Sequence, residues 1–235
     1  MIKAVGYETS ALKTTAQALA DQLHLELDKD AAACLFLSAN SLSLKIPQMS
    51  LLAADFHAAT WYKRKLEGKK QGLVRACKPQ AGLTIIDATA GWGRDAAILA
   101  SFGARVIMLE RNPILAALLR DALMRRTDED KLVMNLSLIE TDALDYLVAL
   151  KPEDFPDIIL IDPMHPQRQK SALVKKDLQI LQQLIGPDAD ALELITCARS
   201  CVRQKVVVKW PQKAKALVPA DASIEGKTIR FDMYF

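Results

Sequence analysis

The chain has 235 residues, a formal net charge of +3, and ordinary shares of hydrophobic (51%) and charged (25%) residues. These values fit one globular domain, or one domain with a small appendage, that buries a sizeable core. They exclude a polycationic protein, so any surface for nucleic acid must be a local patch.

Targeting segments and metal-binding patterns are missing from the sequence. No apolar run approaches the ~18 residues of a membrane-spanning helix, and the N-terminus lacks the basic and apolar regions of a secretion signal. Cys197 and Cys201 lie four residues apart, but two thiolates do not complete a zinc site. We expect a cytoplasmic protein with reduced cysteines and no metal, and the sequence carries no signal for its oligomeric state.

Residues 1 to about 50 predict a small unit of strands and one helix. A short strand is expected over residues 3–7 and a helix over residues 10–23, whose leucines and alanines recur on one face. The segments ACLFLS and SLSLKI flank Ala39-Asn40 and predict a hairpin that ends at Pro47.

The next segment, WYKRKLEGKKQG at residues 61–72, is basic, begins with two aromatic residues and contains two glycines. We predict a basic loop here, followed by a helix over residues 73–78 that stops before Pro79. We therefore divide the chain into an N-terminal extension, residues 1–78, and a main domain, residues 79–235.

From Gly82 onward, apolar β-branched strands alternate with amphipathic helices, which predicts crossover units and a mostly parallel sheet buried on both faces. The expected strands cover residues 83–89, 104–111, 136–142, 157–162 and 205–210, and the expected helices cover residues 92–103, 113–126, 143–150, about 171–186 and about 188–202. The last segment, residues 223–235, predicts a hairpin whose final strand is antiparallel to the sheet.

The turn DATAGWGRDAA, residues 87–97, joins the first strand of this sheet to the first helix. Gly91 and Gly93 permit a tight turn and close approach of a ligand to the backbone. Glu110 ends the next strand, where a carboxylate can accept both ribose hydroxyls of an adenosine. With Ala96 at the third small position, this is the general dinucleotide fingerprint, which NAD and S-adenosylmethionine sites share.

Two features favour the methyl donor over NAD. Arg94 and Asp95 place charges where a pyrophosphate-binding turn usually keeps small residues, and the terminal strand pair is typical of methyltransferase sheets. In that geometry Asp87 and the glycine turn face the methionine moiety, and Asp142 with Ala143 lies beside the adenine. Asp142 can equally serve as the N-cap of the next helix.

A second motif, DPMHP, follows the strand that ends near residue 161. It resembles the (D/N)PP(Y/F) motif of enzymes that methylate planar amines. The Asp162 carboxylate and the Pro163 carbonyl can each accept an N–H and thereby aim the nitrogen lone pair at the methyl group. The rest of the proposed catalytic loop comprises Met164, His165 and Pro166. His165 occupies the place of an aromatic residue that stacks on the target base.

Two basic clusters suit RNA. Lys170, Lys175 and Lys176 follow the catalytic motif and can touch phosphates beside the target base. Lys63 and Arg64 lie beside Trp61 and Tyr62, a combination of basic and aromatic residues that fits single-stranded RNA. A solvated helix face or a solvated loop explains either cluster equally well.

Five segments together resemble the family of ribosomal RNA small-subunit methyltransferase J (RsmJ): DATAGWGRDA, MLERNPILAALL, LIDPMHPQRQKSALVKK, VVVKWP and RFDMY. The match extends from about Leu83 to Tyr234. It implies an α/β, Rossmann-like class I methyltransferase that uses S-adenosylmethionine to methylate the exocyclic N2 of one guanosine in small-subunit (16S) ribosomal RNA. The substrate would be the RNA or the small ribosomal subunit.

The resemblance also implies a set of donor contacts: Arg94, Asp95, Glu110, Arg111, Asp142, Ala143 and Asp162. The sequence departs from the family where His165 replaces an aromatic residue and where Asp142-Ala143 replaces a small, hydroxylic pair. Three alternatives stay open: a methyltransferase for another amine, such as adenine N6 or a protein glutamine, an NAD-dependent oxidoreductase, and a non-catalytic RNA-binding protein.

Overall fold

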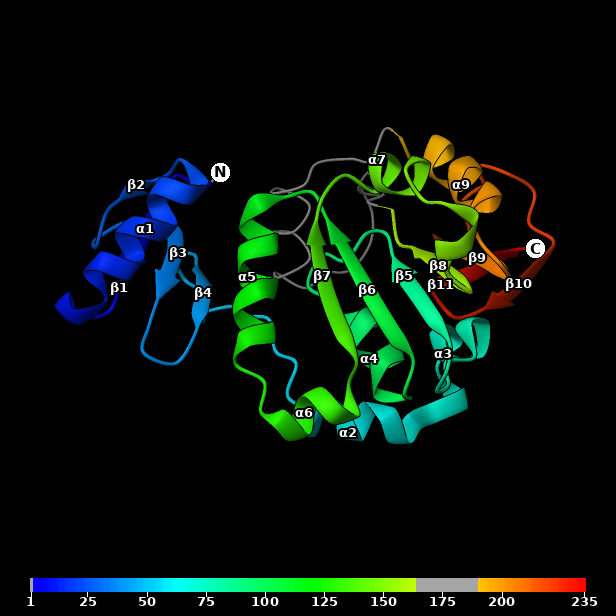
Figure 1. Ribbon diagram of the computed structural model, residues 1–235, viewed down its shortest axis with the longest axis horizontal. Helices are drawn as coiled ribbons and strands as arrows, with labels where there is room; N and C mark the ends of the chain where they lie inside the picture. The colour runs from blue at the N-terminus through cyan, green and yellow to red at the C-terminus, as the bar shows by residue number, and fades with distance from the viewer. Residues whose placement is uncertain (1, 164–189) are drawn as a thin grey trace.

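The computed structural model of the chain describes residues 2–163 and 190–235, which form two sheets and their helices (Figure 1). The predicted helix over residues 171–186, and the beginning of the one predicted near residue 188, lie outside the described residues. Within the described part of the chain, no helix is long and apolar enough to cross a membrane.

The first sheet is small and has the strand order β2-β1-β3-β4. Its strands are β1 (Ala4–Tyr7), β2 (Glu26–Leu27), β3 (Cys34–Leu37) and β4 (Leu42–Lys45). A 3₁₀ turn, Ser10–Leu12, leads into α1 (Lys13–Leu23). The predicted strand, helix and antiparallel hairpin are confirmed. The sequence did not predict β2, because two residues are too short to show an alternating pattern.

The basic segment is a helix rather than the predicted loop. α2 covers Ala58–Glu67 and is followed by a 3₁₀ turn, Gly68–Lys70, and by α3 (Gly72–Cys77). Lys, Arg, Leu and Glu are good helix formers, and no glycine or proline interrupts the segment before Gly68. Gly68 ends α2 with a positive φ of 47°. The predicted helix over residues 73–78 is confirmed.

The second sheet has seven strands in the order β10-β11-β9-β8-β5-β6-β7. They are β5 (Thr84–Asp87), β6 (Arg105–Glu110), β7 (Leu136–Glu140), β8 (Ile158–Ile161), β9 (Lys205–Pro211), β10 (Ala222–Glu225) and β11 (Ile229–Tyr234). All neighbours from β9 to β7 pair in parallel, whereas β11 is antiparallel to both β9 and β10. This order confirms the predicted α/β sheet and its antiparallel last strand.

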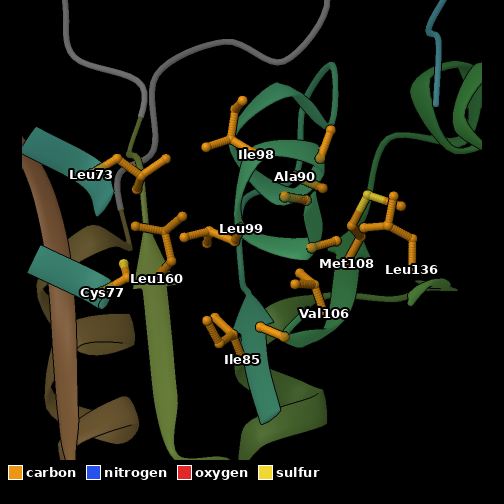
Figure 2. Close-up of a cluster of buried hydrophobic side chains, with 14 of the residues drawn as sticks. Leu73, Cys77, Ile85, Ala90, Ile98, Leu99, Val106, Met108, Leu136 and Leu160 are labelled. Carbon is orange, nitrogen blue, oxygen red and sulfur yellow. The ribbon is translucent and has the colours of Figure 1, made fainter. Parts of the chain in front are cut away.

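Helices cover both faces of the large sheet. They are α4 (Arg94–Ser101), α5 (Pro113–Met124), α6 (Asp128–Val133), α7 (Ala143–Val148) and α9 (Ala191–Ser200). A core cluster joins α3 and α4 to one sheet face through Leu73, Leu99 and Leu160 (Figure 2). A second cluster packs Leu147 of α7 and Ile195 of α9 on the other face. α6 was not predicted, because its six residues are mostly charged.

The small sheet rests against α5 on the side away from the large sheet (Figure 1). Val5, Leu35 and Leu44 share a buried cluster with Leu115 and Leu118 of α5. By contrast, Phe56 and the apolar side chains of α3 belong to the core of the large sheet. The division between residues 78 and 79 stays a prediction.

Candidate active site

The candidate site lies at the carboxyl ends of β5, β6 and β8. The direction in which successive strands are added to the sheet reverses next to β5. The strands β6 and β7 lie on one side of β5, and β8 and β9 lie on the other side. Open α/β sheets bind ligands at such a switch point. Asp87 ends β5, Glu110 ends β6 and Asp162 follows β8, so the sheet brings three of the predicted site residues to one edge.

The glycine turn requires both of its glycines. Gly91 and Gly93 have φ values of 55° and 68°, in the left-handed region that favours glycine. A Cβ on Gly93 would lie 2.6 Å from Cζ of Phe56, so this position also has no room for a side chain. Trp92 between them is buried in the cluster beneath the small sheet. The turn is therefore shaped from both sides by residues that precede the large sheet.

Glu110 ties the glycine turn to the next helix. Its carboxylate accepts the backbone N–H of Gly91 at 2.9 Å and that of Asn112 at 2.8 Å, and the side chain is buried. Asn112 in turn caps α5 by accepting the N–H groups of Ile114 and Leu115. The acid that the sequence assigns to a ribose is thus fixed in place by backbone donors on both sides.

Asp142 is the N-cap of α7, as the sequence suggested, because its side chain accepts the N–H of Leu144 at 2.9 Å. The guanidinium of Arg111 lies 3.3 Å from Asp142 and 2.8 Å from Asp190, joining β6, α7 and the start of α9. Asp142 also borders a cavity of about 510 Å³ between α7 and α9. The adenine contact predicted for Asp142 and Ala143 stays a prediction.

Asp162 is held at two points. Its backbone N–H donates to the Thr89 hydroxyl at 2.7 Å, and its carboxylate lies 2.7 Å from Nζ of Lys209 on β9. Pro163 beside it is buried. The other residues of the predicted catalytic loop, Met164, His165 and Pro166, lie outside the described residues.

Lys209 also contacts Asp95, in the first turn of α4, at 2.8 Å. Asp95 in turn lies 3.5 Å from the guanidinium of Arg64 on α2. Sequence reasoning missed Lys209 and Thr89 as members of the site. The available signal was a lysine in the apolar strand VVVKW, since a charged side chain in a buried strand needs a partner.

The charges at this edge are strongly coupled. Burial favours the neutral lysine, but Asp162 and Asp95 outweigh it and raise the pKa of Lys209. Burial likewise disfavours ionised Asp95, yet Lys209 and then Arg64 outweigh it and lower the pKa of Asp95. For Asp87 the balance is reversed: burial, reinforced by Asp95, raises the pKa of Asp87 to about 8, and the Thr89 N–H and Lys209 offset only part of this effect. The site therefore favours the ionised form of Asp95 and the protonated form of Asp87.

The predicted RNA contacts on α2 differ from one another. Lys63 is exposed, whereas Arg64 is half-buried, donates to Gln71 at 3.0 Å and lies over the ring of Trp61. Arg94, the predicted donor contact next to Asp95, is exposed. The other predicted RNA contacts, Lys170, Lys175 and Lys176, lie outside the described residues. The RNA contacts all stay predictions.

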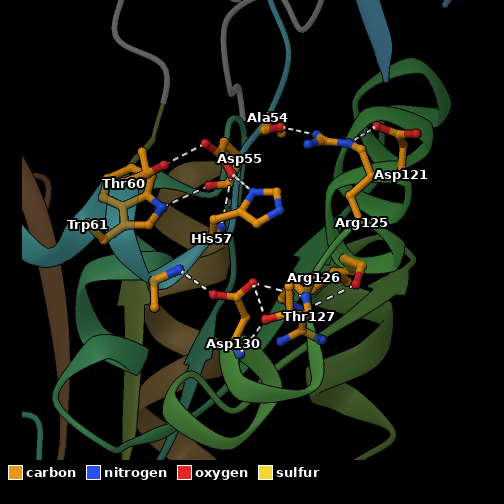
Figure 3. A network of polar contacts seen from close by, with 12 residues as sticks. Ala54, Asp55, His57, Thr60, Trp61, Asp121, Arg125, Arg126, Thr127 and Asp130 are labelled. Carbon is orange, nitrogen blue, oxygen red and sulfur yellow. Dashed lines mark hydrogen bonds and ion pairs between the residues drawn. The ribbon is translucent and has the colours of Figure 1, made fainter. Parts of the chain in front are cut away.

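A polar network anchors the start of α2 (Figure 3). Asp55 accepts hydrogen bonds from the hydroxyl of Thr60 at 2.6 Å and the backbone N–H of His57 at 2.9 Å. Asp130 of α6 accepts the N–H of Ala58 at 2.7 Å, and Arg125, the C-cap of α5, donates to the carbonyl of Ala54. These contacts fix the helix that carries Arg64.

The cysteines and the acids in the described part of the chain form no group of three or more that could hold a metal ion. Cys34, Cys77 and Cys201 are buried, and Cys197 is half-buried; all four are free thiols. Burial raises the pKa of Cys77 above its ordinary range and that of Cys201 to about 12. These thiols are therefore neutral and unreactive at physiological pH.

The strand order, the glycine turn and the acid after the second strand define a class I S-adenosylmethionine-dependent methyltransferase. A family model for S-adenosylmethionine-dependent methyltransferases matches residues 18–235. A crystal structure of such a methyltransferase from Neisseria gonorrhoeae is similar over 99% of this chain and 95% of that chain, with a TM-score of 0.74 and 26% identity. The predicted fold class and cofactor are confirmed.

The chain belongs to the family of ribosomal RNA small subunit methyltransferase J. It is 64% identical to the family member from Legionella pneumophila strain Paris, over 99% of this chain and 96% of the relative. Identity is 43% to the member from Nitrosococcus oceani, over 85% and 83% of the two chains. The member from Yersinia pestis is 40% identical over 92% and 89%. The resemblance noted in the sequence is confirmed.

Proposed function

We propose that this protein transfers a methyl group from S-adenosylmethionine to the exocyclic N2 of one guanosine in small-subunit (16S) ribosomal RNA, in the cytoplasm. The relatives reported above carry a name that specifies small-subunit ribosomal RNA, which supports the substrate class. The observation that carries the proposed chemistry is the Asp162 carboxylate, fixed by Lys209 and Thr89 at the switch point of the sheet.

The exocyclic nitrogen of guanine is a poor nucleophile because its lone pair is delocalised into the ring. Asp162 can accept one N–H of this amine, and the carbonyl of Pro163 can accept the other. Two acceptors at fixed positions turn the nitrogen so that its lone pair points out of the ring plane. The negative charge of Asp162 also stabilises the positive charge that grows on the nitrogen, and the surplus proton leaves to solvent after transfer.

The residues around the glycine turn fit an adenosyl donor. Gly91 and Gly93 have the positive φ values of a tight turn beside the strand end, and Glu110 at the end of β6 is proposed to accept the ribose hydroxyls. Asp142 and Arg111 border the side where the adenine would lie. When bound, S-adenosylmethionine supplies a methyl group that the amine nitrogen takes with its lone pair, while the electrons of the carbon–sulfur bond remain on sulfur.

RNA would approach along α2 and the segment after Pro163. Lys63, Lys69 and Lys70 are exposed and can supply positive charge for phosphates. The lysines at 170, 175 and 176 are proposed to do the same. A paired or stacked guanosine would have to be flipped out of its helix to reach Asp162.

The test is to incubate the purified protein with radiolabelled S-adenosylmethionine and small ribosomal subunits from a strain that lacks the gene, and then to identify the labelled nucleoside. Label in N2-methylguanosine supports the proposal. Label in another nucleoside, or in protein, contradicts the proposed N2 specificity and moves the reaction to another planar amine. Naked 16S RNA, tested in parallel, separates the RNA from the assembled subunit as substrate.

A further inference from the structure

Lys209 occupies an unusual position for a charged residue. It lies on β9, one residue past the pair Ile161–Val208, and therefore at the level where Asp162 leaves β8. Its neighbour on the same strand face, Val207, is fully buried in the core beneath α4. The side chain of Lys209 is only 24% exposed. An ammonium group at this depth requires partners of opposite charge.

The partners come from two other elements. The single Nζ of Lys209 lies 2.7 Å from Oδ2 of Asp162 and 2.8 Å from Oδ2 of Asp95. Oδ1 of Asp95 then lies 3.5 Å from the guanidinium of Arg64. Charges of alternating sign thus run from α2 through α4 and β9 to the end of β8. We call these four residues the carboxylate clamp.

We propose that Lys209 is a positioning residue for methyl transfer: it ties Asp162 to Asp95, so that the Asp162 carboxylate keeps one orientation. The inference rests on the proposed function, in which Asp162 accepts an N–H of the target amine. Arg64 closes the outer end of the clamp, because its guanidinium lies 3.5 Å from the other carboxylate oxygen of Asp95.

The need for such a residue follows from the surroundings of Asp162. The side chain is 40% exposed, so packing restricts its rotamer only in part, and the contact with Lys209 adds a further restraint. Asp95 also faces this edge, where its negative charge disfavours a second ionised carboxylate, as it does that of Asp87. Burial of Cys77 on α3 favours its neutral thiol. Within the described residues, Lys209 is the cation that contacts both Asp95 and Asp162.

The experiment compares the rates of single-turnover methyl transfer at saturating donor and ribosomal substrate. The variants are Lys209→Met, which keeps the length but not the charge, Lys209→Arg, which keeps the charge, and Lys205→Met. Lys205 is a matched control, because it is a second buried lysine on the same face of β9, four residues away from the clamp position.

We expect Lys209→Met to lower the rate about 10- to 100-fold near neutral pH, the effect of losing charge-assisted hydrogen bonds. Lys209→Arg should restore most of the rate, because it keeps the positive charge between Asp162 and Asp95. Lys205→Met should leave the rate within about twofold of wild type.

A double-mutant comparison isolates the interaction between Lys209 and Asp162. Asp162→Asn keeps an acceptor oxygen but removes the charge that Lys209 holds, so adding Lys209→Met to it should change the rate less than about threefold. A rate of Lys209→Met within about twofold of wild type, or a decrease that arginine does not rescue, overturns the inference.

The same assay distinguishes a failure of the inference about Lys209 from a failure of the proposed function. It records label on any nucleoside, so a wild-type product other than N2-methylguanosine contradicts the proposed specificity while the Lys209 comparison still decides the clamp. A wild-type protein that binds the donor but labels nothing overturns both.

Discussion

Two N-terminal segments reach the glycine turn by different forces. The small sheet contacts it through apolar packing, because Trp92 is buried among side chains such as Val5 and Leu35. The α2 segment contacts the site through charges and hydrogen bonds as well, because Arg64 pairs with Asp95 and the Asp55 and Asp130 carboxylates hold the start of the helix. Only the second kind of contact responds strongly to salt and pH.

The two kinds of contact therefore have different roles in the site: one sets its shape, and the other sets its electrostatics. Apolar packing sets the shape of the turn between Gly91 and Gly93 and keeps it constant across conditions. The charged contacts of α2 set the electrostatics around Asp95 and hence around Lys209 and Asp162. Variants of the two segments should therefore differ in how their effects change with pH and ionic strength, not only in size.

The largest effect on stability is expected from a substitution in the glycine turn itself. Gly93→Ala combines a positive φ with a Cβ 2.6 Å from the Phe56 ring, and should destabilise the fold by about 3–5 kcal/mol. Gly82→Ala is the matched control, since Gly82 has a φ of 88° but nothing within 4 Å of its Cβ. It should cost only about 1–2 kcal/mol in urea unfolding. Equal losses for both variants would show that the Phe56 contact is unimportant.

Asp130→Asn tests the polar anchor of α2. Asp130 accepts the N–H groups of Thr127 and Ala58, so the amide places a donor against a donor and should cost about 1–3 kcal/mol. Burial alone would raise the pKa of Asp130, but these backbone donors outweigh it and lower the pKa. The stabilisation is thus complete above the unfolded pKa of about 4 and is lost as the pH falls below it. Denaturation at several pH values should show the two proteins converging in acid.

A smaller effect is expected from Arg64→Gln. The pair with Asp95 is partly exposed, so the loss in unfolding free energy should be below about 1 kcal/mol and should shrink in high salt. Lys63→Gln is the control, with the same charge change at an exposed position of the same helix. We expect Lys63→Gln to weaken RNA binding and Arg64→Gln to lower the transfer rate as well. Identical kinetic profiles would contradict the distinct roles.

The smallest effect is expected from Trp92→Phe on the apolar side. The indole N–H is buried and has no hydrogen-bond partner among the residues that the structure describes. Its removal relieves an unsatisfied donor but leaves a small void, so the two contributions should nearly cancel, to within about 1 kcal/mol. The change should be independent of salt in thermal unfolding. A strongly salt-dependent loss would show that Trp92 has a polar role.

The strands of the large sheet and most helices could be predicted from the sequence because their apolar periodicity is local. The basic segment over residues 61–72 was predicted to be a loop because its basic residues suggested solvation, but Lys and Arg favour a helix, and α2 covers its first part. Glu110 and Asp162 were placed at the sheet edge by their positions at strand ends. Lys209 was not, because its contacts with Asp162 and Asp95 span 47 and 114 residues. Such long-range pairing follows from strand order, which the local pattern does not reveal.

The most direct test of the central claim, that Asp162 fixes the target amine, is the single-turnover methyl-transfer rate of Asp162→Ala measured together with donor binding by calorimetry. The account predicts a decrease in rate of at least about 100-fold, with a much smaller change in donor affinity. A variant that binds the donor and transfers the methyl group at the wild-type rate would contradict it, since no acceptor carboxylate would then be needed.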